Sequence, residues 1–406
     1  MSKWMRKIKI LHLACYSTNI GDCANIDGIR RTLQRNLPDC EITFTDEDMI
    51  GYSEFMGKKR YDCREFVALA NSHDAMIIGG GGLFSGLSHH DKTGCYVGLD
   101  IETLERIQVP VIYYALGFAS YYGQKYKAKS AFGSYLEYLT KRPNTLISVR
   151  NDGSLKRLGQ IFGHTAVQNI TTVPDGGFHM ATLNVEHKEL SDEKPLVTVQ
   201  LAGDKQRYRF REEPSISYRL MARVGLADKM AGGKRRRIFL SQLSSALVHL
   251  VNEQNIRIVF VPHIPADLEI ISEVLSTLPR DISRLRSTVA PVVSADSAYR
   301  KAFDLYRHVD MVVGMRFHGN VCPIGMGVPT LGLGTHPQLP GLYDELGLQE
   351  HCMDVLEDDF EDMFFMRVID ILGRLSEVNA RYKKVARDLD EQTTLFQAKM
   401  KKLILS

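Results

Sequence analysis

The 406-residue sequence predicts an α/β protein of two domains, each built around a parallel sheet. A chain of this length exceeds the usual size of a single hydrophobic core, so two domains of about 150 to 200 residues are expected. Short apolar runs typical of buried strands also alternate with helical segments, and these strands are followed by polar or glycine-rich turns. Such alternation is typical of a parallel sheet with helices between its strands.

The first domain is expected over residues 1–185. Its predicted strands are residues 8–14, 41–45, 75–78, 111–116, 146–149 and 171–173. Helical patterns continue from the first turn to residue 33 and recur at residues 64–71, 101–107, 124–139 and from residue 154. In open α/β sheets ligands bind at the edge formed by the carboxyl ends of the strands, where these polar turns lie.

The second domain is expected over residues 186–375, after a polar and acidic link at residues 181–194. Its predicted strands are residues 196–201, 256–261, 289–293, 311–313 and 330–333. Helices are predicted at residues 238–252, before residue 278, at residues 297–307 and at residues 320–327. Residues 376–406 are predicted to form a C-terminal helix that packs back on the first domain.

The composition is that of a globular protein, with 44% hydrophobic and 24% charged residues. The apolar run from residue 8 is too short and too polar for a signal peptide, and no window holds 18 uninterrupted apolar residues. The seven cysteines are scattered without a CxxC pair, which indicates reduced thiols. We therefore expect a cytoplasmic protein, and contact with the inner face of the membrane stays open.

The positive charge is concentrated in residues 203–237. This segment holds eleven Lys or Arg against four Asp or Glu, a local net charge of +7, so the rest of the chain carries −4 of the total +3. The segment could neutralise a phosphate-bearing donor or an anionic polymer, or it could be a solvated insertion. It has few interleaved aromatic residues, so nucleic acid is not expected as a partner.

Residues 311–334 form the stretch with the clearest chemistry. Arg316 and His318 follow a predicted strand, and Gly319 and Asn320 lead into a short helix. Backbone N–H groups at the start of a helix attract anions. Arginine supplies a permanent planar cation, whereas histidine can move a proton near neutral pH. The pattern predicts an anion site with a proton donor.

The four glycines after the third strand do not form a dinucleotide-binding motif. The sixth position of G-x-G-x-x-G is Phe84 when counted from Gly79, and Ser85 when counted from Gly80. No lysine of the Walker type follows. The loop can still bring its backbone close to a ligand, because glycine tolerates unusual backbone angles.

Three further turns carry charged residues whose roles stay open. Asp22 lies in the first strand-to-helix turn, where it could bind sugar hydroxyls or cap the helix. Arg150 ends a strand and could bind an anion or form an ion pair. Asp175, between a proline and a glycine, is either a binding residue or a turn residue.

Two groups contain residue types that ligate metals. The first is His263 and Asp267 with His318, and the second is His89, His90 and Asp91 with Cys95. Neither group has a recognised zinc spacing, so no metal is expected.

Taken together, these turns resemble the motifs of the polysaccharide pyruvyl transferase family. The resembling segments are Asn19-x-Gly21-Asp22, Gly79-Gly80-Gly81-Gly82-Leu83-Phe84, Ser148-Val149-Arg150 with Ser154, Val173-Pro174-Asp175-x-x-Phe178, Pro262-His263-x-x-x-Asp267, and Met315-Arg316-x-His318-Gly319 with Gly327-x-Pro329. They run in the family's order over residues 10–335. The resemblance implies a glycosyltransferase-B-like fold, in which two Rossmann-like domains face a cleft, the first on the acceptor side and the second on the donor side.

The resemblance also implies an activity, the transfer of an enolpyruvyl group from phosphoenolpyruvate to a sugar diol of a surface polysaccharide or its precursor. The product would be a cyclic pyruvate ketal, with release of phosphate and with no metal or other cofactor. The implied catalytic residues are His318, Arg316 and His263. The implied phosphoenolpyruvate ligands are Arg150, Arg316, Gly319 and Asn320. The implied acceptor-side residues are Asn19, Gly21, Asp22, Gly80, Gly81, Gly82 and Asp175.

Two features depart from the family pattern. Ala115-Leu116-Gly117-Phe118 stands where Gly-x-Gly-Pro is frequent, and the basic segment 203–237 is not a family hallmark. Both leave open the acceptor, which could be a sugar, an oligosaccharide or a lipid-linked precursor. A nucleotide-sugar glycosyltransferase of the B type and a non-catalytic sugar-phosphate-binding protein remain alternatives. Peripheral membrane contact and the oligomeric state also stay open.

Overall fold

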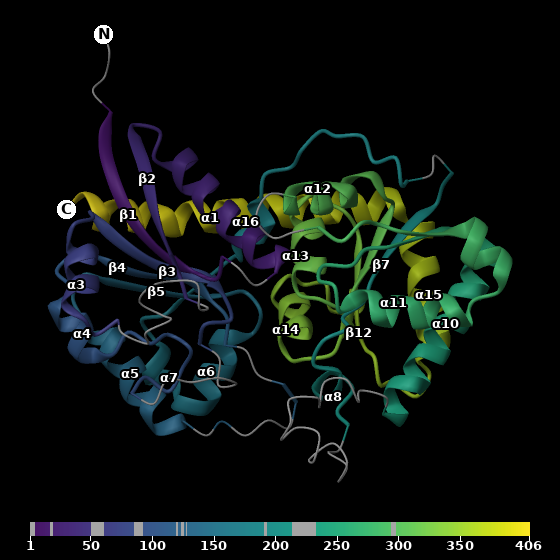
Figure 1. Cartoon of the computed structure of the whole chain (residues 1–406), viewed down its shortest axis with the longest axis horizontal. Coiled ribbons are helices and arrows are strands. Elements are labelled where there is room, and N and C mark those ends of the chain that lie inside the picture. The colour runs from purple at the N-terminus through teal and green to yellow at the C-terminus, as the bar shows by residue number, and fades with distance from the viewer. Residues whose placement is uncertain are drawn as a thin grey trace. The chain divides into compact units, whose positions relative to one another are not determined.

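The computed structural model describes residues 5–16, 19–49, 61–84, 92–118, 121–122, 126, 128–190, 193–212, 233–293 and 298–406. The chain divides into two compact units, each with one six-stranded parallel sheet (Figure 1). The first unit covers residues 1–120, 125–181 and 387–406, and the second covers residues 121–124 and 182–386. The predicted α/β class with two parallel sheets is confirmed. The predicted boundaries at residues 185 and 375 stay a prediction.

The sheet of the first unit has the strand order β2-β1-β3-β4-β5-β6. Its strands are β1 (Arg6–Ala14), β2 (Cys40–Asp48), β3 (Ala75–Gly81), β4 (Val111–Leu116), β5 (Thr145–Arg150) and β6 (Thr171–Val173). Its helices are α1 (Ile20–Asn36), α3 (Arg64–Asn71), α4 (Ile101–Arg106), α5 (Lys129–Lys141), α6 (Ser154–Phe162), α7 (His164–Val167) and the 3-10 helix η1 (Gly176–His179).

Both faces of this sheet are buried, which explains why its central strands are continuous apolar runs. Along β3, Met76 and Ile78 join one apolar cluster, and Ala75 and Ile77 join another. The alternation follows from the two-residue period of a strand. Helices α3, α4 and α5 cover the first cluster, and α1 covers the second together with the C-terminal helix α16 (Leu375–Leu405) (Figure 1).

The last part of α16, from residue 387, belongs to the first unit. Phe396 and Met400 enter the apolar cluster beneath α1. Gln397 is also buried there, and its Nε2 donates to Thr32 Oγ1 at 2.7 Å and to Tyr114 Oη at 3.1 Å. The chain terminus therefore completes a core that the first strands of the sequence begin.

The sheet of the second unit has the strand order β12-β11-β10-β7-β8-β9. Its strands are β7 (Leu196–Gln200), β8 (Arg257–Phe260), β9 (Ser287–Val289), β10 (Met311–Gly314), β11 (Thr330–Gly334) and β12 (Cys352–Asp354). Its α-helices are α8 (Gln206–Arg209), α10 (Lys234–Gln254), α11 (Asp267–Thr277), α12 (Tyr299–Asp304), α13 (His318–Gly325), α14 (Gln338–Glu345), α15 (Phe360–Gly373) and the start of α16. Short 3-10 and π segments are η3 (Ile282–Arg286), η4 (Leu305–His308) and η5 (Gln349–His351).

One predicted strand of this unit is displaced. The sequence pattern favours a strand at residues 289–293, whereas β9 is Ser287–Val289. The last ladder bond runs from the N–H of Ala290 to the carbonyl of Phe260, at 2.8 Å. Pro291 follows and has no N–H to continue the ladder, so the strand ends before it.

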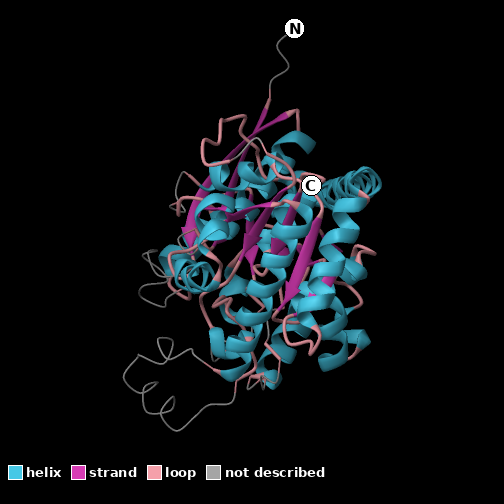
Figure 2. Cartoon of the chain, turned by 90° about the vertical axis from the view of Figure 1, so that its right-hand side faces the viewer, coloured by secondary structure: helices cyan, strands magenta, loops and turns pink. Residues whose placement is uncertain are grey.

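Both sheets have a topological switch point, at which the connections from two neighbouring strands run in opposite directions. In the first unit β1 lies between β2 and β3, so the switch point is between β1 and β3. In the second unit β7 lies between β8 and β10, and the order matches the doubly wound arrangement 3-2-1-4-5-6. Figure 2 shows the strands in magenta with helices in cyan on either side of them. Ligands bind outside the carboxyl ends of strands at such points.

Among the helices that the structure describes, none has both the length and the apolar character that crossing a membrane requires.

The close packing of α1 on η1 in the first unit can be tested by substituting a glycine at their contact. Alanine usually stabilises a helix interior by about 1 kcal/mol relative to glycine. At Gly28 in α1, however, a β-carbon would lie 1.8 Å from the carbonyl oxygen of Gly176. We expect Gly28→Ala to lower the free energy of unfolding by about 1 to 3 kcal/mol in urea titrations.

The matched control is Gly133→Ala in α5 of the same unit. A β-carbon there would lie 3.4 Å from a ring carbon of Phe162, which is an ordinary contact. This variant should be neutral or stabilising. Equal effects of the two substitutions would contradict the close packing of α1 on η1.

Candidate active site

The turn after β10 is held by the end of β7, the neighbouring strand across the switch point. The N–H of Met315 donates to the carbonyl oxygen of Gln200 at 3.0 Å, and the N–H of Arg316 donates to Gln200 Oε1 at 2.7 Å. Gly319 lies against the same side chain, because a β-carbon there would be 3.0 Å from Oε1. Gln200 thus fixes the backbone between β10 and α13.

Arg316 is clamped by two carboxylates. Its Nε donates to Asp267 Oδ2 at 2.8 Å, and its Nη2 donates to Asp204 Oδ1 at 2.8 Å and also contacts Asp267 Oδ1. The side chain is 13% exposed. Within the described residues no side chain or carbonyl binds Nη1, so this nitrogen is available to a ligand oxygen.

Asp267 joins the ends of three strands. Its Oδ2 accepts from the N–H of His263 at 2.9 Å and of Ile264 at 3.2 Å, both after β8. Its Oδ1 accepts from the N–H of Gly203 at 2.9 Å, after β7. Arg316, after β10, completes the set. One fully buried carboxylate therefore ties together the carboxyl ends of β7, β8 and β10.

Asp204 receives a second cation from α8. Nη2 of Arg209 donates to Asp204 Oδ1 at 2.9 Å, and Nη1 donates to Thr335 Oγ1 at 3.1 Å. Burial acts to raise the pKa of Asp204, but Arg209 and Arg316 hold that pKa well below its ordinary value. The carboxylate therefore stays ionised at neutral pH, and the two arginines and two aspartates balance in charge.

His263 and His318 lie at the same edge in different surroundings. His263 is buried, with Nε2 2.8 Å from the hydroxyl of Tyr306. Burial lowers the pKa of His263 to about 3, although the charge of Asp267 acts to raise it. Its ring is therefore neutral at physiological pH. His318 is the first residue of α13 and is 7% exposed.

Asn320 lies inside the turn. Its Nδ2 donates to the carbonyl oxygens of Gly314 at 2.9 Å and Arg316 at 2.8 Å, and its Oδ1 accepts from the hydroxyl of Tyr343 at 2.7 Å. The side chain is fully buried. The contact with phosphoenolpyruvate predicted for Asn320 stays a prediction, and it would have to compete with these three bonds.

All the predicted acceptor-side residues except Asp175, which follows β6, lie at the switch point of the first unit. Asn19 caps α1, since its Oδ1 accepts from the N–H of Gly21 at 2.8 Å and its Nδ2 donates to Asp22 Oδ2 at 2.6 Å. Gly81 ends β3, and a β-carbon on it would lie 3.7 Å from Asp22 Oδ1. Gly80 has φ +92°, which favours glycine, and Gly82 follows the strand.

Arg150 is also clamped, but within the first unit. Its Nε donates to Asp152 Oδ2 at 2.7 Å and its Nη1 to Asp175 Oδ2 at 3.3 Å. Asn25 of α1 donates to the same oxygen of Asp175 at 2.6 Å. Gly117 leaves room for the guanidinium, because a β-carbon there would lie 2.5 Å from it. Burial acts to lower the pKa of Arg150, but the two aspartates hold it above its ordinary value.

The structure thus divides the predicted site residues into two groups. The second unit contains Arg316, His318, His263, Gly319 and Asn320. The first unit contains Asn19, Gly21, Asp22, Gly80, Gly81, Gly82, Asp175 and also Arg150. The predicted role of each residue stays a prediction.

Four residues of these clusters escaped the sequence analysis: Gln200, Asp204, Arg209 and Asp152. Asp204 and Arg209 lie inside the basic segment 203–237. The sequence analysis considered only the net charge of this segment, which does not reveal that these two residues form an ion pair. Gln200 ends a strand, and a polar residue at a strand end was the one available signal. Asp152 belongs to a helix-entry sequence that also explains it as a local turn residue.

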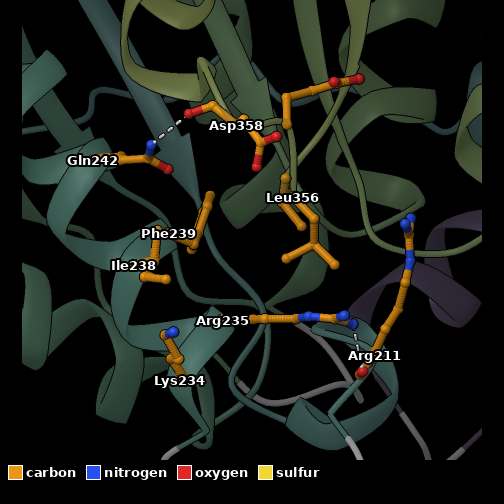
Figure 3. Close-up of a pocket in the computed structure, with 10 residues that line it drawn as sticks. Arg211, Lys234, Arg235, Ile238, Phe239, Gln242, Leu356 and Asp358 are labelled. Atoms are coloured by element: carbon orange, nitrogen blue, oxygen red, sulfur yellow. Dashed lines mark hydrogen bonds between the residues drawn. The ribbon is translucent and has the colours of Figure 1, made fainter.

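A cavity of about 470 Å³ lies in the second unit, at the carboxyl end of β12. It is lined by Arg211, Lys234, Arg235, Ile238, Phe239, Gln242, Val355, Leu356, Glu357 and Asp358. Figure 3 shows its three cationic side chains at one end and the bond from Gln242 to the carbonyl of Asp358, 3.1 Å long, at the other. The described parts of the basic segment therefore line this cavity, and Arg316 and His318 are not among its lining residues.

Metal-ligand spacing occurs elsewhere in the second unit. Among the described residues it is found at His187, Asp304 and His308, and not at His263, Asp267 and His318. His89, His90 and Asp91 lie outside the described residues.

A family model described as polysaccharide pyruvyl transferase matches residues 19–337. No curated protein sequence matches the chain.

Solved structures share the architecture but little sequence. A protein of Listeria monocytogenes, provisionally identified as a UDP-N-acetylglucosamine 2-epimerase, has a TM-score of 0.57 at 12% identity, over 97% of this chain and 95% of its own. Alr3699/HepE of Anabaena, solved with UDP and glucose, has a TM-score of 0.55 at 9% identity, over 97% of this chain and 98% of its own. The UDP-GlcNAc 2-epimerase of Methanocaldococcus jannaschii has a TM-score of 0.50 at 10% identity, over 91% of this chain and 93% of its own. At such identities the likeness concerns the fold alone, and the predicted glycosyltransferase-B-like class is confirmed.

The neutral state of His263 makes the stability of the second unit depend on pH. The pKa of His263 is about 3 in the folded chain, against about 6.5 in an unfolded one. Between these values the unfolded state binds the proton, so stability falls as the pH falls, by up to about 1.4 kcal/mol per pH unit from this residue. The difference in unfolding free energy between the wild type and His263→Gln should therefore shrink from pH 7 to pH 4.

The control is His249→Gln, at a side chain that is 53% exposed. It shows how much pH dependence the loss of an exposed histidine produces. A difference for His263→Gln that does not shrink more than the control's would contradict the buried neutral imidazole.

Proposed function

Because the chain belongs to the polysaccharide pyruvyl transferase family, we propose that it moves the enolpyruvyl group of phosphoenolpyruvate onto a sugar diol. The acceptor belongs to a surface polysaccharide or its precursor, and the products are a cyclic pyruvate ketal and phosphate. One observation carries the proposal. Arg316 and His318 follow β10 at the switch point of a doubly wound sheet, where ligands bind in such folds.

Arg316 is suited to hold the anionic donor. Phosphoenolpyruvate carries a carboxylate and a phosphate, both of which pair well with a guanidinium. Asp267 and Asp204 fix the plane of the guanidinium and leave Nη1 for the donor. They also offset its charge, so the amide N–H groups that begin α13 are needed as further donors to the leaving phosphate.

His318 is suited to the proton transfer. In the proposed reaction one acceptor hydroxyl adds to C2 of phosphoenolpyruvate while C3 gains a proton and becomes a methyl group. The C2–O bond to phosphate then breaks, and the phosphate leaves with the proton of the first hydroxyl. The second hydroxyl adds to C2 and loses its proton to the imidazole. An imidazole can give the first proton and take back the last, a contribution of about 10² to 10⁴ in rate.

His263 is better suited to positioning than to acid catalysis. Its ring is neutral at physiological pH because of its low pKa, and its Nε2 is engaged with the hydroxyl of Tyr306. A neutral ring neither donates a proton readily nor attracts phosphate. We therefore assign His263 to holding the geometry around His318.

For Arg150 and Asn320 we propose support of the neighbouring turns in addition to the predicted contact with the donor. Their polar groups are already bonded within their own units. The proposed acceptor-side group remains Asn19, Gly21, Asp22, Gly80, Gly81, Gly82 and Asp175. A carboxylate such as that of Asp22 can accept hydrogen bonds from sugar hydroxyls.

The test measures phosphate released from phosphoenolpyruvate in the presence of galactosides, mannosides and N-acetylhexosaminides. His318→Ala should lower the rate by about 10² to 10⁴, because the proton donor is lost. Arg316→Lys keeps the charge but loses the planar fork, so it should remove most of the activity. Circular dichroism verifies that both variants are folded.

His249→Ala, at an exposed residue, serves as the control and should keep full activity. Retained activity in both His318→Ala and Arg316→Lys would overturn the assignment of the site. Absence of phosphate release with every acceptor, together with thermal stabilisation by uridine or guanosine diphosphate, would favour a nucleotide-sugar glycosyltransferase.

A further inference from the structure

A second cluster of titratable residues lies in the second unit, and none of its residues belongs to the turn after β10. His187 comes from the segment that precedes β7, Asp304 ends α12 and His308 ends η4. Asp304 Oδ2 lies 3.3 Å from His187 Nε2 and 3.5 Å from His308 Nε2. The centroids of the two imidazole rings are 5.1 Å apart.

The two separations from Asp304 Oδ2 are those of ligands around one ion. Zinc takes imidazole nitrogen and carboxylate oxygen at about 2.0 to 2.2 Å in tetrahedral geometry, so neighbouring ligand atoms lie about 3.3 to 3.6 Å apart. The three atoms all lie within 4.8 Å of one another. No side chain has to move far for a metal ion to contact all three.

The other nitrogen of His187 has a carboxylate partner. Its Nδ1 lies 3.2 Å from Glu189 Oε1. A metal-bound histidine commonly donates its second ring N–H to such a carboxylate, which fixes the ring and turns the bare nitrogen toward the ion. With Nδ1 protonated, Nε2 and Asp304 Oδ2 are both acceptors and face each other at 3.3 Å. A metal ion shared by the two atoms resolves that opposition.

Burial and ligand type favour the metal. Asp304 and His187 are buried, whereas the side chain of His308 is 38% exposed and leaves an entrance for an ion. Three protein ligands leave a fourth position for water. Two imidazoles with one carboxylate suit zinc and neighbouring transition metals, whereas calcium and magnesium prefer oxygen ligands.

We propose that His187 Nε2, His308 Nε2 and Asp304 Oδ2 bind one zinc-class divalent metal ion, with Glu189 orienting His187. The ion fastens the segment before β7 to the end of α12 and η4, although Asp304 follows His187 by 117 residues.

The fastened element also faces the candidate active site. Phe303 and Tyr306 flank Asp304 in sequence, and both contact His263. The ring centroids of Phe303 and His263 are 5.0 Å apart. A metal that holds α12 and η4 in place therefore also holds the neighbours of His263. This proposal does not depend on the reaction proposed above.

The test uses the full-length chain without a polyhistidine tag, treated with a chelator and then titrated with Zn²⁺ or Co²⁺. We expect one ion to bind per chain and the unfolding temperature to rise with metal concentration. Bound Co²⁺ should show visible bands of a low-symmetry tetrahedral site without the thiolate charge-transfer band that cysteine ligands would add.

His308→Gln is the most informative variant, because the residue is partly exposed and its loss should leave the fold intact. It should abolish stoichiometric binding, and Glu189→Gln should weaken binding by about 10- to 100-fold. His249→Gln is the matched control and should bind like the wild type. His249 Nδ1 lies 3.7 Å from Glu361, and the part of the chain that the structure describes supplies no third ligand there. No stoichiometric binding by the wild type, or equal binding by His308→Gln, would overturn the proposal.

Discussion

The candidate site of the second unit depends on the ion pair between Arg316 and Asp267. Asp267 accepts from backbone N–H groups after β7 and β8, while Arg316 extends from the turn after β10. Removing either partner leaves the other buried charge only partly compensated, by Asp204 for Arg316 and by backbone N–H groups for Asp267, which costs up to about 3 to 5 kcal/mol. A pair of this kind adds little stability beyond what an apolar pair would supply. We infer that its value is geometric, because it sets the position of three strand ends and of the first turn of α13.

The first unit repeats the arrangement with different residues. Arg150 at the end of β5 lies between Asp152 and Asp175, and Asp175 is also bonded to Asn25 of α1. Gly117 leaves space for the guanidinium. Ala115 in the same segment has φ +46°, a region that favours glycine. The departure from Gly-x-Gly-Pro therefore falls where the backbone is strained, beside the buried arginine.

Local sequence was sufficient to predict most of the strands, but it missed β12, displaced β9 and did not predict which strands are neighbours. The runs of β3 and β4 are apolar because both faces of the sheet are buried, so their pattern is visible along the chain. Strand order has no local signature, and the switch point between β7 and β10 emerged from the structure alone. The carboxylate partners of Arg316 could not be predicted either, because contacts between distant segments have no local signature. Asp204 precedes Arg316 by 112 residues and lies within a basic stretch. The cluster around Asp304 likewise joins distant segments.

The central claim is that phosphoenolpyruvate binds at the turn between β10 and α13. A crystal structure of the protein soaked with phosphoenolpyruvate tests it most directly. The account predicts the donor within hydrogen-bond distance of Arg316 Nη1, with its phosphate at the first turn of α13 and its methylene carbon facing His318. Phosphoenolpyruvate bound instead in the cavity lined by Arg211, Lys234 and Arg235, with the β10 turn empty, would contradict the account.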